Sequence, residues 1–275
     1  MTVDELICFG KKYIHKTQAE MLLAALMNVN SLELLLMLNE KVSQDVANDF
    51  KEKVMLIKDN KPIQYVIGNV NFYGNTFKVN KNVLIPRFET EELVEKTLNM
   101  IKEHFPYPVK VIDLGCGSGA IGLTIKSKLP SSSVTLLDIS SDALEVAKEN
   151  ANNLDLDVDF IQNDMLNNLK NKYDVIISNP PYIRNDEEIQ DIVYNNEPHL
   201  ALYGGIDGLD FYRKIRKDLL NNVNDTFLVA LEIGDMQKND VINIFSDIPG
   251  TVVTGEKDMQ KRDRFVFVLK KWIIF

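Results

Sequence analysis

The chain has 275 residues, of which 45% are hydrophobic and 26% charged, enough apolar content for a full core and a second, smaller domain. Its formal net charge is −9 and its sequence pI about 5.0, so its overall field weighs against binding to nucleic-acid phosphates, without excluding a local basic patch. The chain has two cysteines, Cys8 and Cys116, and neither has a metal-ligand spacing, which predicts a reduced protein that holds no metal. Its N-terminus lacks a secretory pattern and no run of about 18 apolar residues occurs, which predicts a cytoplasmic protein that spans no membrane.

The first sixty residues predict a small helical bundle, because no strand pattern occurs there and apolar residues recur at helical spacing. A short helix is expected around Leu22, a second over 31–40 with Ser31 as its N-cap, and a third from an N-cap at Ser43 to Lys58. The third has four apolar side chains on one face, at steps of four, four and three: Val46, Phe50, Val54 and Ile57. Both a generic packing role and a substrate-docking role fit such a bundle.

The character of the chain changes in residues 61–85, which are rich in Val, Ile, Tyr and Phe and are punctuated by Gly68 and Gly74. This pattern predicts a hairpin or a pair of strands that links two domains. Pro86 ends the segment, and Thr90 is expected to cap the helix that follows. Four apolar residues lie on one face of that helix: Leu93, Val94, Leu98 and Ile101.

From residue 110 onward, strand patterns alternate with helix patterns. Strands are expected over 110–115, 134–140, 159–164, 173–179, 227–234 and 264–275. Helices are expected over 121–129, 142–154 and 236–247. Strands that alternate with helices predict a parallel sheet covered on both faces, with a ligand site at the carboxyl ends of the strands.

A glycine-rich loop follows the first of these strands. Gly115, Gly117 and Gly119 let the backbone approach a ligand closely, just before a helix whose N-terminus offers free N–H groups. Asp138, at the end of the next strand, is placed to accept hydrogen bonds from the two ribose hydroxyls of an adenosine. Gly117, Gly119 and Gly122 also satisfy the dinucleotide pattern G-x-G-x-x-G, so a nicotinamide dehydrogenase fits these residues as well.

Asp113 favours a different cofactor, S-adenosylmethionine. A carboxylate two residues before the first glycine suits the cationic methionine part of that molecule and suits a pyrophosphate poorly. After the third strand, Asp164 is placed to accept from the adenine amino group and Met165 to pack on the ring. The alternative is that Asp164 and Met165 are only a solvated strand end.

The sequence Asn179-Pro180-Pro181-Tyr182 follows the fourth strand. Two prolines hold the backbone extended and leave the Pro180 carbonyl without a ladder partner. The Asn179 side-chain oxygen and the Pro180 carbonyl can each accept one hydrogen of a planar NH2 group, and Tyr182 can stack on that group. This arrangement predicts methylation of an amide or amino nitrogen.

These motifs together resemble the bacterial peptide chain release factor N5-glutamine methyltransferases, the HemK or PrmC family. The resemblance covers nearly the whole chain, in the segments KPIQYVIGNVNFYGNTFKVNKNVLIPRFETEELVE, DLGCGSGAIG, SNPPYI, NEPHLALYGGIDGLDFYRKI and LEIGDMQ. It implies a class I methyltransferase fold, an α/β fold that is Rossmann-like with a mostly parallel seven-stranded sheet, over residues 86–275. It also implies an N-terminal helical-bundle domain over 1–60 that helps to hold the substrate, and a β-hairpin linker over 61–85.

The resemblance also implies the reaction and the residues that perform it. The methyl donor would be S-adenosylmethionine, with S-adenosylhomocysteine as product, and the acceptor would be the glutamine of the Gly-Gly-Gln loop of class 1 release factors. The cofactor-contacting positions would be Asp113, Gly115, Cys116, Gly117, Ser118, Gly119, Asp138, Asp164, Met165 and Asn179. The glutamine site would comprise Asn179, Pro180, Pro181 and Tyr182, with Asn179, Pro180 and Tyr182 acting in catalysis. Arg87, Glu89 and Thr90 fall on a segment near the active site, and Arg87 and Glu89 are expected to contact the substrate.

Two positions depart from the family pattern. Phe88 replaces the second proline of Pro-Arg-Pro-Glu-Thr-Glu, which predicts a less rigid loop. Lys261 replaces the glycine of Asp-x-x-Gly-x-x-Arg, between Asp258 and Arg264, which predicts a local difference in that turn.

Two other functions compete with this one. A DNA or RNA methyltransferase acting on adenine N6 or cytosine N4 would use the same Asn-Pro-Pro-Tyr geometry on a flipped base, but the acidic composition weighs against stable nucleic-acid binding. A cofactor-binding module without catalysis would have no need to orient an amide. We expect a monomer.

Overall fold

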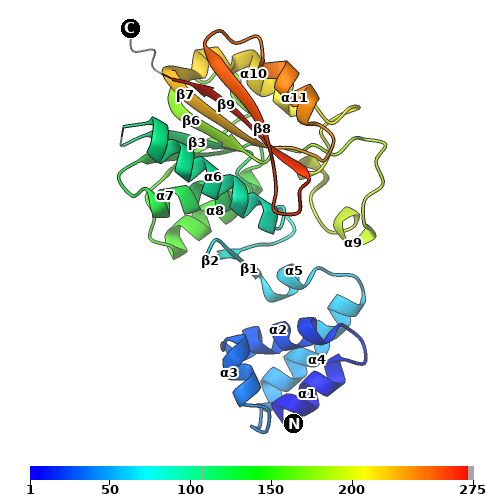
Figure 1. Cartoon of the computed structure of the whole chain (residues 1–275). Coiled ribbons are helices and arrows are strands. Elements are labelled where there is room, and N and C mark those ends of the chain that lie inside the picture. Colours follow the sequence, from blue (N-terminus) through cyan, green and yellow to red (C-terminus); the bar gives the residue numbers. More distant parts are fainter. Residues whose placement is uncertain (107, 272–275) are drawn as a thin grey trace. The chain divides into compact units, whose positions relative to one another are not determined.

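The computed structural model describes residues 1–106 and 108–271 (Figure 1). The chain divides into two compact units. The first comprises residues 1–69 with 189–196, and the second comprises residues 70–188 with the described residues from 197 onward.

The first unit is built of helices, as its sequence predicts. These are α1 (Val3–Gly10), α2 (Lys16–Met27), α3 (Ser31–Leu36), α4 (Gln44–Lys58), α5 (Ile63–Ile67) and the short α9 (Asp191–Tyr194). Fully buried side chains from α1, α2 and α4 form its core, including Leu6, Leu22, Phe50 and Val54. The apolar stripe predicted on α4 therefore faces the interior of the bundle.

The helix caps were predicted with mixed success. Ser43 caps α4 as expected, its hydroxyl accepting from the Val46 amide at 3.3 Å. The prediction for Ser31 is wrong, because Asn30 caps α3 and its side-chain oxygen accepts from the amides of Leu32 and Glu33. The Glu33 carboxylate returns a bond to the Asn30 amide, which completes a capping box one residue earlier than predicted.

Residues 61–85 hold the predicted hairpin, but only in part. The strands are β1 (Asn69–Phe72) and β2 (Asn75–Lys78), joined at Tyr73 and Gly74, which both have positive φ as a tight two-residue turn requires. The part before the hairpin forms α5 instead of a strand, and it ends at Gly68 in the left-handed conformation.

The helix after the linker is α6 (Phe88–His104), and Thr90 does not cap it. The N-cap is Arg87, and Thr90 lies inside the first turn, 3% exposed, with its hydroxyl turned into the protein. The four apolar residues predicted on one face of α6 are all buried.

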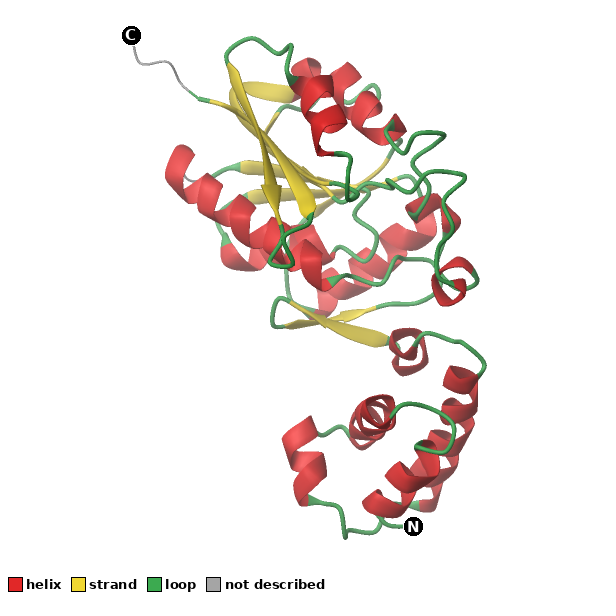
Figure 2. Cartoon of the chain, turned by 45° about the vertical axis from the view of Figure 1, so that its right-hand side comes forward, coloured by secondary structure: helices red, strands yellow, loops and turns green. Residues whose placement is uncertain are grey.

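The second unit contains a seven-stranded sheet, whose strands are drawn in yellow in Figure 2. The strand order is β5-β4-β3-β6-β7-β9-β8. Its strands are β3 (Lys110–Leu114), β4 (Ser133–Asp138), β5 (Asp159–Gln162), β6 (Tyr173–Ser178), β7 (Val223–Glu232), β8 (Thr251–Lys257) and β9 (Asp263–Lys270). The first five pair in parallel, while β9 is antiparallel to both β7 and β8. The predicted mostly parallel seven-stranded sheet is therefore confirmed. Strand β8 was not predicted from the sequence, and residues 272–275 of the last predicted strand lie outside the described residues.

Helices cover both faces of this sheet. On one face lie α6, α7 (Ala120–Lys128) and α8 (Ser141–Asn153), and on the other lie α10 (Asp210–Asn222) and α11 (Lys238–Phe245), as Figure 1 shows. Alternate residues of each strand enter the two cores, so that Val111 of β3 faces the first and Ile112 the second. Helix α10 was not predicted from the sequence.

Strand β3 marks the point where the strand order reverses. It pairs with β4 on one side and with β6 on the other, so the carboxyl ends of these three strands lie side by side. A crevice opens at such a point in doubly wound sheets, which makes it the place to look for a ligand site.

The turn between β8 and β9 holds Lys261 at a φ of +65°, a conformation that glycine adopts most readily. Asp258 and Arg262 close the turn by two hydrogen bonds of 2.9 Å, one between their backbones and one to the Asp258 carboxylate. A lysine thus occupies a turn of the kind that suits the family's glycine.

Replacing Lys261 by glycine should therefore raise the free energy of unfolding by up to about 1 kcal/mol, because a left-handed side-chain-bearing residue is strained by about 1–2 kcal/mol. Urea unfolding measures this difference. Lys172→Gly is the control, since Lys172 is exposed in a loop with ordinary negative φ and its replacement should lower stability. A loss of stability in both variants would show that the turn is not strained.

Candidate active site

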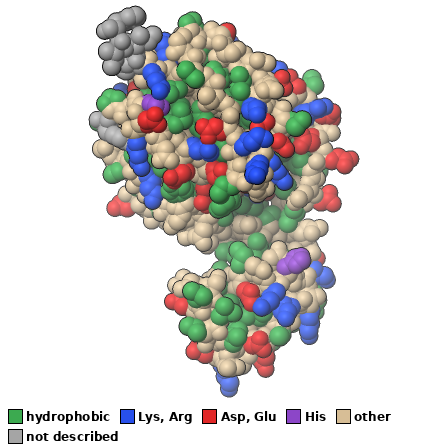
Figure 3. Space-filling model, viewed as in Figure 1, with side chains coloured by type: hydrophobic (Ala, Val, Ile, Leu, Met, Phe, Trp, Pro, Cys, Tyr) green, Lys and Arg blue, Asp and Glu red, His purple; other side chains and the backbone are tan. Residues whose placement is uncertain are grey.

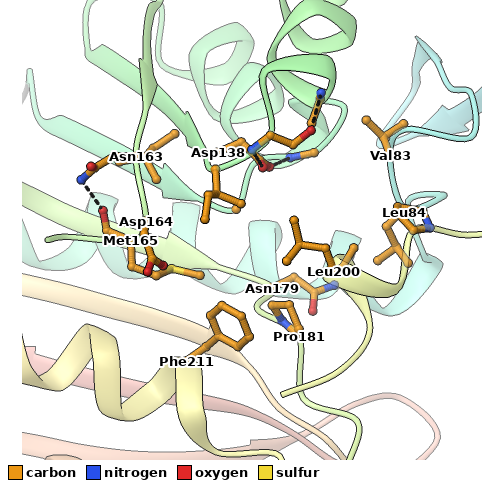
Figure 4. Close-up of a pocket in the computed structure, with 18 of the residues that line it drawn as sticks. Val83, Leu84, Asp138, Asn163, Asp164, Met165, Asn179, Pro181, Leu200 and Phe211 are labelled. Atoms are coloured by element: carbon orange, nitrogen blue, oxygen red, sulfur yellow. Dashed lines mark hydrogen bonds between the residues drawn. The ribbon is translucent and has the colours of Figure 1, made fainter. Parts of the chain in front are cut away.

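A cavity of about 860 Å³, including its open mouth, lies at the carboxyl ends of β3, β4 and β6 (Figure 4). Its walls come from segments far apart in the chain, namely residues 82–84, the glycine loop, the ends of β4, β5 and β6, residues 198–201 and helix α10. A concave pocket that is largely apolar with a few polar groups is the usual form of a small-molecule site.

The glycine loop is held in an unusual backbone conformation. Gly115, Gly117 and Gly119 have φ values of +68°, +54° and +79°, so each of them needs the freedom of glycine. The Asp138 carboxylate accepts from the Gly117 amide and the Ser140 amide, both at 2.9 Å, which ties the loop to the end of β4. Gly115, Gly117 and Asp138 line the cavity, and burial raises the pKa of Asp138.

Asp113 lies behind this loop and does not line the cavity. It is fully buried, with one oxygen accepting from the Gly122 amide at 2.9 Å, while Oδ1 has no hydrogen-bond partner within the described part of the chain. Burial, with Asp138 nearby, raises the pKa of Asp113 to about 7. Cys116 and Ser118 are also buried, and neither they nor Gly119 line the cavity.

One wall of the cavity is formed by the segment after β5. Asp164 and Met165 both line it, and Figure 4 shows them side by side. Their contacts with an adenine ring stay a prediction. The Asp164 carboxylate binds the Lys214 ammonium at 3.0 and 3.1 Å, a partner that comes from the unpredicted helix α10. Phe211 of the same helix and Ile139 add apolar surface, which makes the cavity suitable for a flat ring.

Sequence patterns missed several of these lining residues. Phe211 and Lys214 lie on one side of α10, three residues apart, and recognition of that helix would have suggested a shared surface. Val83, Leu84 and Leu200 come from segments without regular patterns, so no local signal identifies them.

Asn179 and Pro181 reach the cavity from the end of β6. The Asn179 amide nitrogen donates to the Thr90 hydroxyl at 3.1 Å. This bond turns the amide nitrogen toward Thr90 and leaves the Asn179 side-chain oxygen as an acceptor for a ligand. This places a hydrogen-bond acceptor in the same cavity as Gly115 and Asp138.

Tyr182 lines a separate, more polar cavity together with Arg184, Gln237 and Arg264. Its hydroxyl approaches a Glu232 carboxylate oxygen at 3.5 Å. Burial and the charge of Glu232 raise the pKa of Tyr182, so it is a neutral donor. Of the four residues 179–182, the first and third border one cavity and the last borders the other.

Arg87 and Glu89 do not line either cavity. The Arg87 guanidinium binds the buried Glu197 carboxylate at 2.6 Å, and that carboxylate also accepts from the Ile85 amide. This ion pair fastens the segment before α6 to the segment around Pro198, which itself lines the main cavity. A contact between Arg87 or Glu89 and a substrate stays a prediction.

The described residues contain no group of three or more histidine, cysteine or acidic side chains arranged to hold a metal ion. In the same part of the chain, none of the helices has the length and apolar character needed to cross a bilayer. On the faces shown in Figure 3, basic and acidic side chains are intermixed.

Comparisons with known proteins agree with this geometry. Residues 90–204 match the family model described as Methyltransferase small domain, and residues 13–68 match the one described as PrmC N-terminal domain. A release factor glutamine methyltransferase of Streptococcus pneumoniae is 39% identical over 89% of this chain and 88% of its own length, and one of Bacillus subtilis is 37% identical over 98% of both chains. A methyltransferase structure from Pyrococcus furiosus covers 84% of this chain and 100% of its own, with a TM-score of 0.54 at 15% identity, which supports the fold alone. The chain belongs to the family of release factor glutamine methyltransferases.

Proposed function

We propose that the protein transfers a methyl group from S-adenosylmethionine to the side-chain amide nitrogen of the glutamine in the Gly-Gly-Gln loop of class 1 peptide chain release factors. The observation that carries this proposal is the position of Asn179. Its amide nitrogen donates to Thr90, which leaves its oxygen as an acceptor at the cavity formed by the glycine loop and Asp138. An acceptor at that place suits a substrate NH2 group.

The cavity fits the proposed cofactor. Gly115, Gly117 and Asp138 would hold the ribose and the amino-acid part, and the apolar walls at Ile139 and Phe211 would enclose the adenine. Asp113 lies behind the loop and does not line the cavity, so its contact with the cationic part of the cofactor stays a prediction. When bound, S-adenosylmethionine supplies an electrophilic methyl group on a cationic sulfur.

The residues of the chain have to make a poor nucleophile react. The lone pair of an amide nitrogen is delocalised into its carbonyl, and no side chain of ordinary pKa removes its proton beforehand. The Asn179 oxygen and the Pro180 carbonyl would accept the two N–H groups and fix the nitrogen. A contact between Tyr182 and this group stays a prediction, because Tyr182 lines the other cavity. Alignment of this kind contributes about 7–11 kcal/mol to rate enhancement, and the two acceptors gain strength as the N–H groups acidify.

We further propose a division of labour along the chain, with residues 1–60 docking the release factor, residues 61–85 as linker and residues 86–275 as catalytic domain. Three leucines of α3 support the docking role, because they are exposed although a soluble bundle would normally bury them: Leu32, Leu35 and Leu36. The protein would act in the cytoplasm as a monomer.

A labelling experiment tests the reaction. The protein is incubated with S-adenosylmethionine labelled in the methyl group and, separately, with a purified class 1 release factor, the same factor with its loop glutamine changed to alanine, and duplex DNA. Label on the unaltered release factor alone supports the proposal. Label on DNA instead would replace it with a base methyltransferase, and label on the loop variant would place the reaction at another residue.

Asp138→Asn should weaken binding of S-adenosylhomocysteine about 10-fold. The asparagine keeps one acceptor oxygen, so one of the two backbone amides that donate to Asp138 loses its partner, and one acceptor for the ribose hydroxyls is lost as well. Titration calorimetry measures the affinity. Asp142→Asn is the control, since Asp142 is exposed at the start of α8 and does not line this cavity. Equal affinities in both variants would contradict the role of Asp138.

A further inference from the structure

A chain of hydrogen bonds leads from the cavity into the protein interior. The Asn179 amide nitrogen donates to the Thr90 hydroxyl at 3.1 Å, and that hydroxyl donates to Oε2 of Glu232 at 2.7 Å. The three residues come from the end of β6, the first turn of α6 and the end of β7. Thr90 and Glu232 are 3% and 1% exposed, so water does not compete for these bonds.

The direction of this chain follows from the chemistry of its members. An ionised carboxylate only accepts hydrogen bonds, so the single proton of the Thr90 hydroxyl goes to Glu232. The oxygen of Thr90 then has only lone pairs left, and only an N–H group of Asn179 can satisfy them. If the Asn179 amide turned by half a rotation, its oxygen would face the oxygen of Thr90 and no hydrogen would lie between them.

We propose that Thr90 and Glu232 are positioning residues that fix the orientation of the Asn179 amide, so that its oxygen and not its nitrogen meets the substrate. This proposal rests on the proposed function, in which an acceptor must face the substrate NH2 group. With the reverse orientation, Asn179 would present a donor to a donor. This hydrogen-bond chain of Asn179, Thr90 and Glu232, called the relay below, therefore favours a substrate that places an NH2 group next to the Asn179 oxygen. It disfavours a substrate that places a carbonyl oxygen there.

The second oxygen of Glu232 and its backbone are also held. The Tyr182 hydroxyl approaches Oε1 at 3.5 Å, and the Tyr212 hydroxyl donates to the Glu232 carbonyl at 2.9 Å. Both tyrosines have pKa values raised by burial, so they remain donors. Glu232 is therefore surrounded by hydroxyl donors, which suits an acceptor-only carboxylate.

The charge on Glu232 depends on pH. Its pKa is raised to about 7, mainly by burial and also by Glu89 on α6, against the lowering effects of Thr90, Arg264 on β9 and Tyr182. A protonated Glu232 carries a hydrogen of its own, which it can donate to Thr90. The Thr90 proton is then free to turn toward Asn179, and the preference for one amide orientation is lost. Turnover should accordingly fall as the pH drops through about 7.

A pair of substitutions at Thr90 tests the relay. Thr90→Val keeps the shape and removes the hydroxyl, and should lower kcat for release-factor methylation roughly 10- to 100-fold, with the Kd of S-adenosylhomocysteine changed less than about two-fold. Thr90→Ser restores the hydroxyl and should recover most of the turnover. A purely structural role would instead be seen as a lower melting temperature and weaker cofactor binding in both variants.

Two further measurements of kcat test the relay, one in an Asn179→Ala background and one as a function of pH. Adding Thr90→Val to an Asn179→Ala background should cause little further loss, because both changes remove the same acceptor. In Glu232→Gln the decline of kcat below about pH 7 should disappear, since the titrating group is gone. Full turnover in Thr90→Val, or an unchanged acid limb in Glu232→Gln, would overturn the relay. Failure of the wild-type protein to methylate the release factor would instead refute the proposed function.

Discussion

Replacing Asn179 by alanine should lower the turnover number for release-factor methylation by roughly 10²- to 10³-fold, the range seen when one preorganised hydrogen-bonding group is removed from an active site. The side chain borders the cavity through an oxygen whose orientation is fixed by Thr90, and alanine has no acceptor to replace it. Most of the affinity for S-adenosylhomocysteine should remain, because the glycine loop and Asp138 stay in place. Single-turnover methylation and calorimetry separate the two effects.

Asn99→Ala is the matched control for this substitution. Asn99 is an exposed asparagine on α6, outside both cavities, and its loss should change neither turnover nor cofactor binding. If Asn179→Ala retained wild-type turnover, or if it lost cofactor affinity in proportion to turnover, Asn179 would have no specific role in orienting the substrate.

The sequence predicted those parts of the site that are contiguous in the chain. Five predicted residues that line the cavity lie at or just after the end of a strand, and strands of a parallel sheet bring their carboxyl ends together: Gly115, Gly117, Asp138, Asn179 and Pro181. Their positions therefore follow from local patterns and one rule of topology. The parallel sheet itself was predictable for the same reason, because its buried strands are nearly continuous apolar runs.

The features that were predicted wrongly or not at all depend on contacts between residues far apart in the chain. Thr90 resembled an N-cap by its local sequence, but its hydroxyl binds Glu232, 142 residues further along the chain. No pattern near Thr90 carries that information. Strand β8 alternates between intermediate and exposed residues at the edge of the sheet, so it lacks the apolar run that identified the central strands.

Helix α10 was not predicted, because its sequence does not mark its beginning. Its buried residues follow helical spacing, yet its N-terminus has no side-chain cap to mark where it begins. Missing this helix removed Phe211 and Lys214 from the predicted site, and with them the ion pair to Asp164. The domain boundaries proposed from the sequence remain a proposal, since the compact units divide near residue 69 and assign residues 189–196 to the first unit.

The free energy of unfolding of the cofactor-free protein should decrease between pH 5 and pH 8, because two fully buried carboxyl groups retain their protons in the folded state. Burial raises the pKa of Asp113 and of Glu232 to about 7, whereas carboxyl groups in an unfolded chain titrate near 4. Their contribution to stability is complete below about pH 4 and is lost as the pH rises through 7. Each group should account for roughly 2–3 kcal/mol over this interval.

Urea unfolding of Asp113→Asn at several pH values isolates one of these groups. Its stability should fall less steeply than that of the wild type between pH 5 and pH 8, whereas Asp157→Asn, at an exposed position, should leave the slope unchanged. Parallel slopes for the wild type and Asp113→Asn would show that Asp113 is ionised throughout.

Glu232 connects this stability profile to turnover. Its carboxyl group stabilises the fold when protonated but orients Thr90 and Asn179 only when ionised. The pH range in which the relay operates is therefore the range in which the fold has lost part of its stability, a trade between stability and activity at a single side chain. Glu232→Gln should remove both dependences at once, giving a flatter unfolding profile together with a turnover that no longer declines below about pH 7.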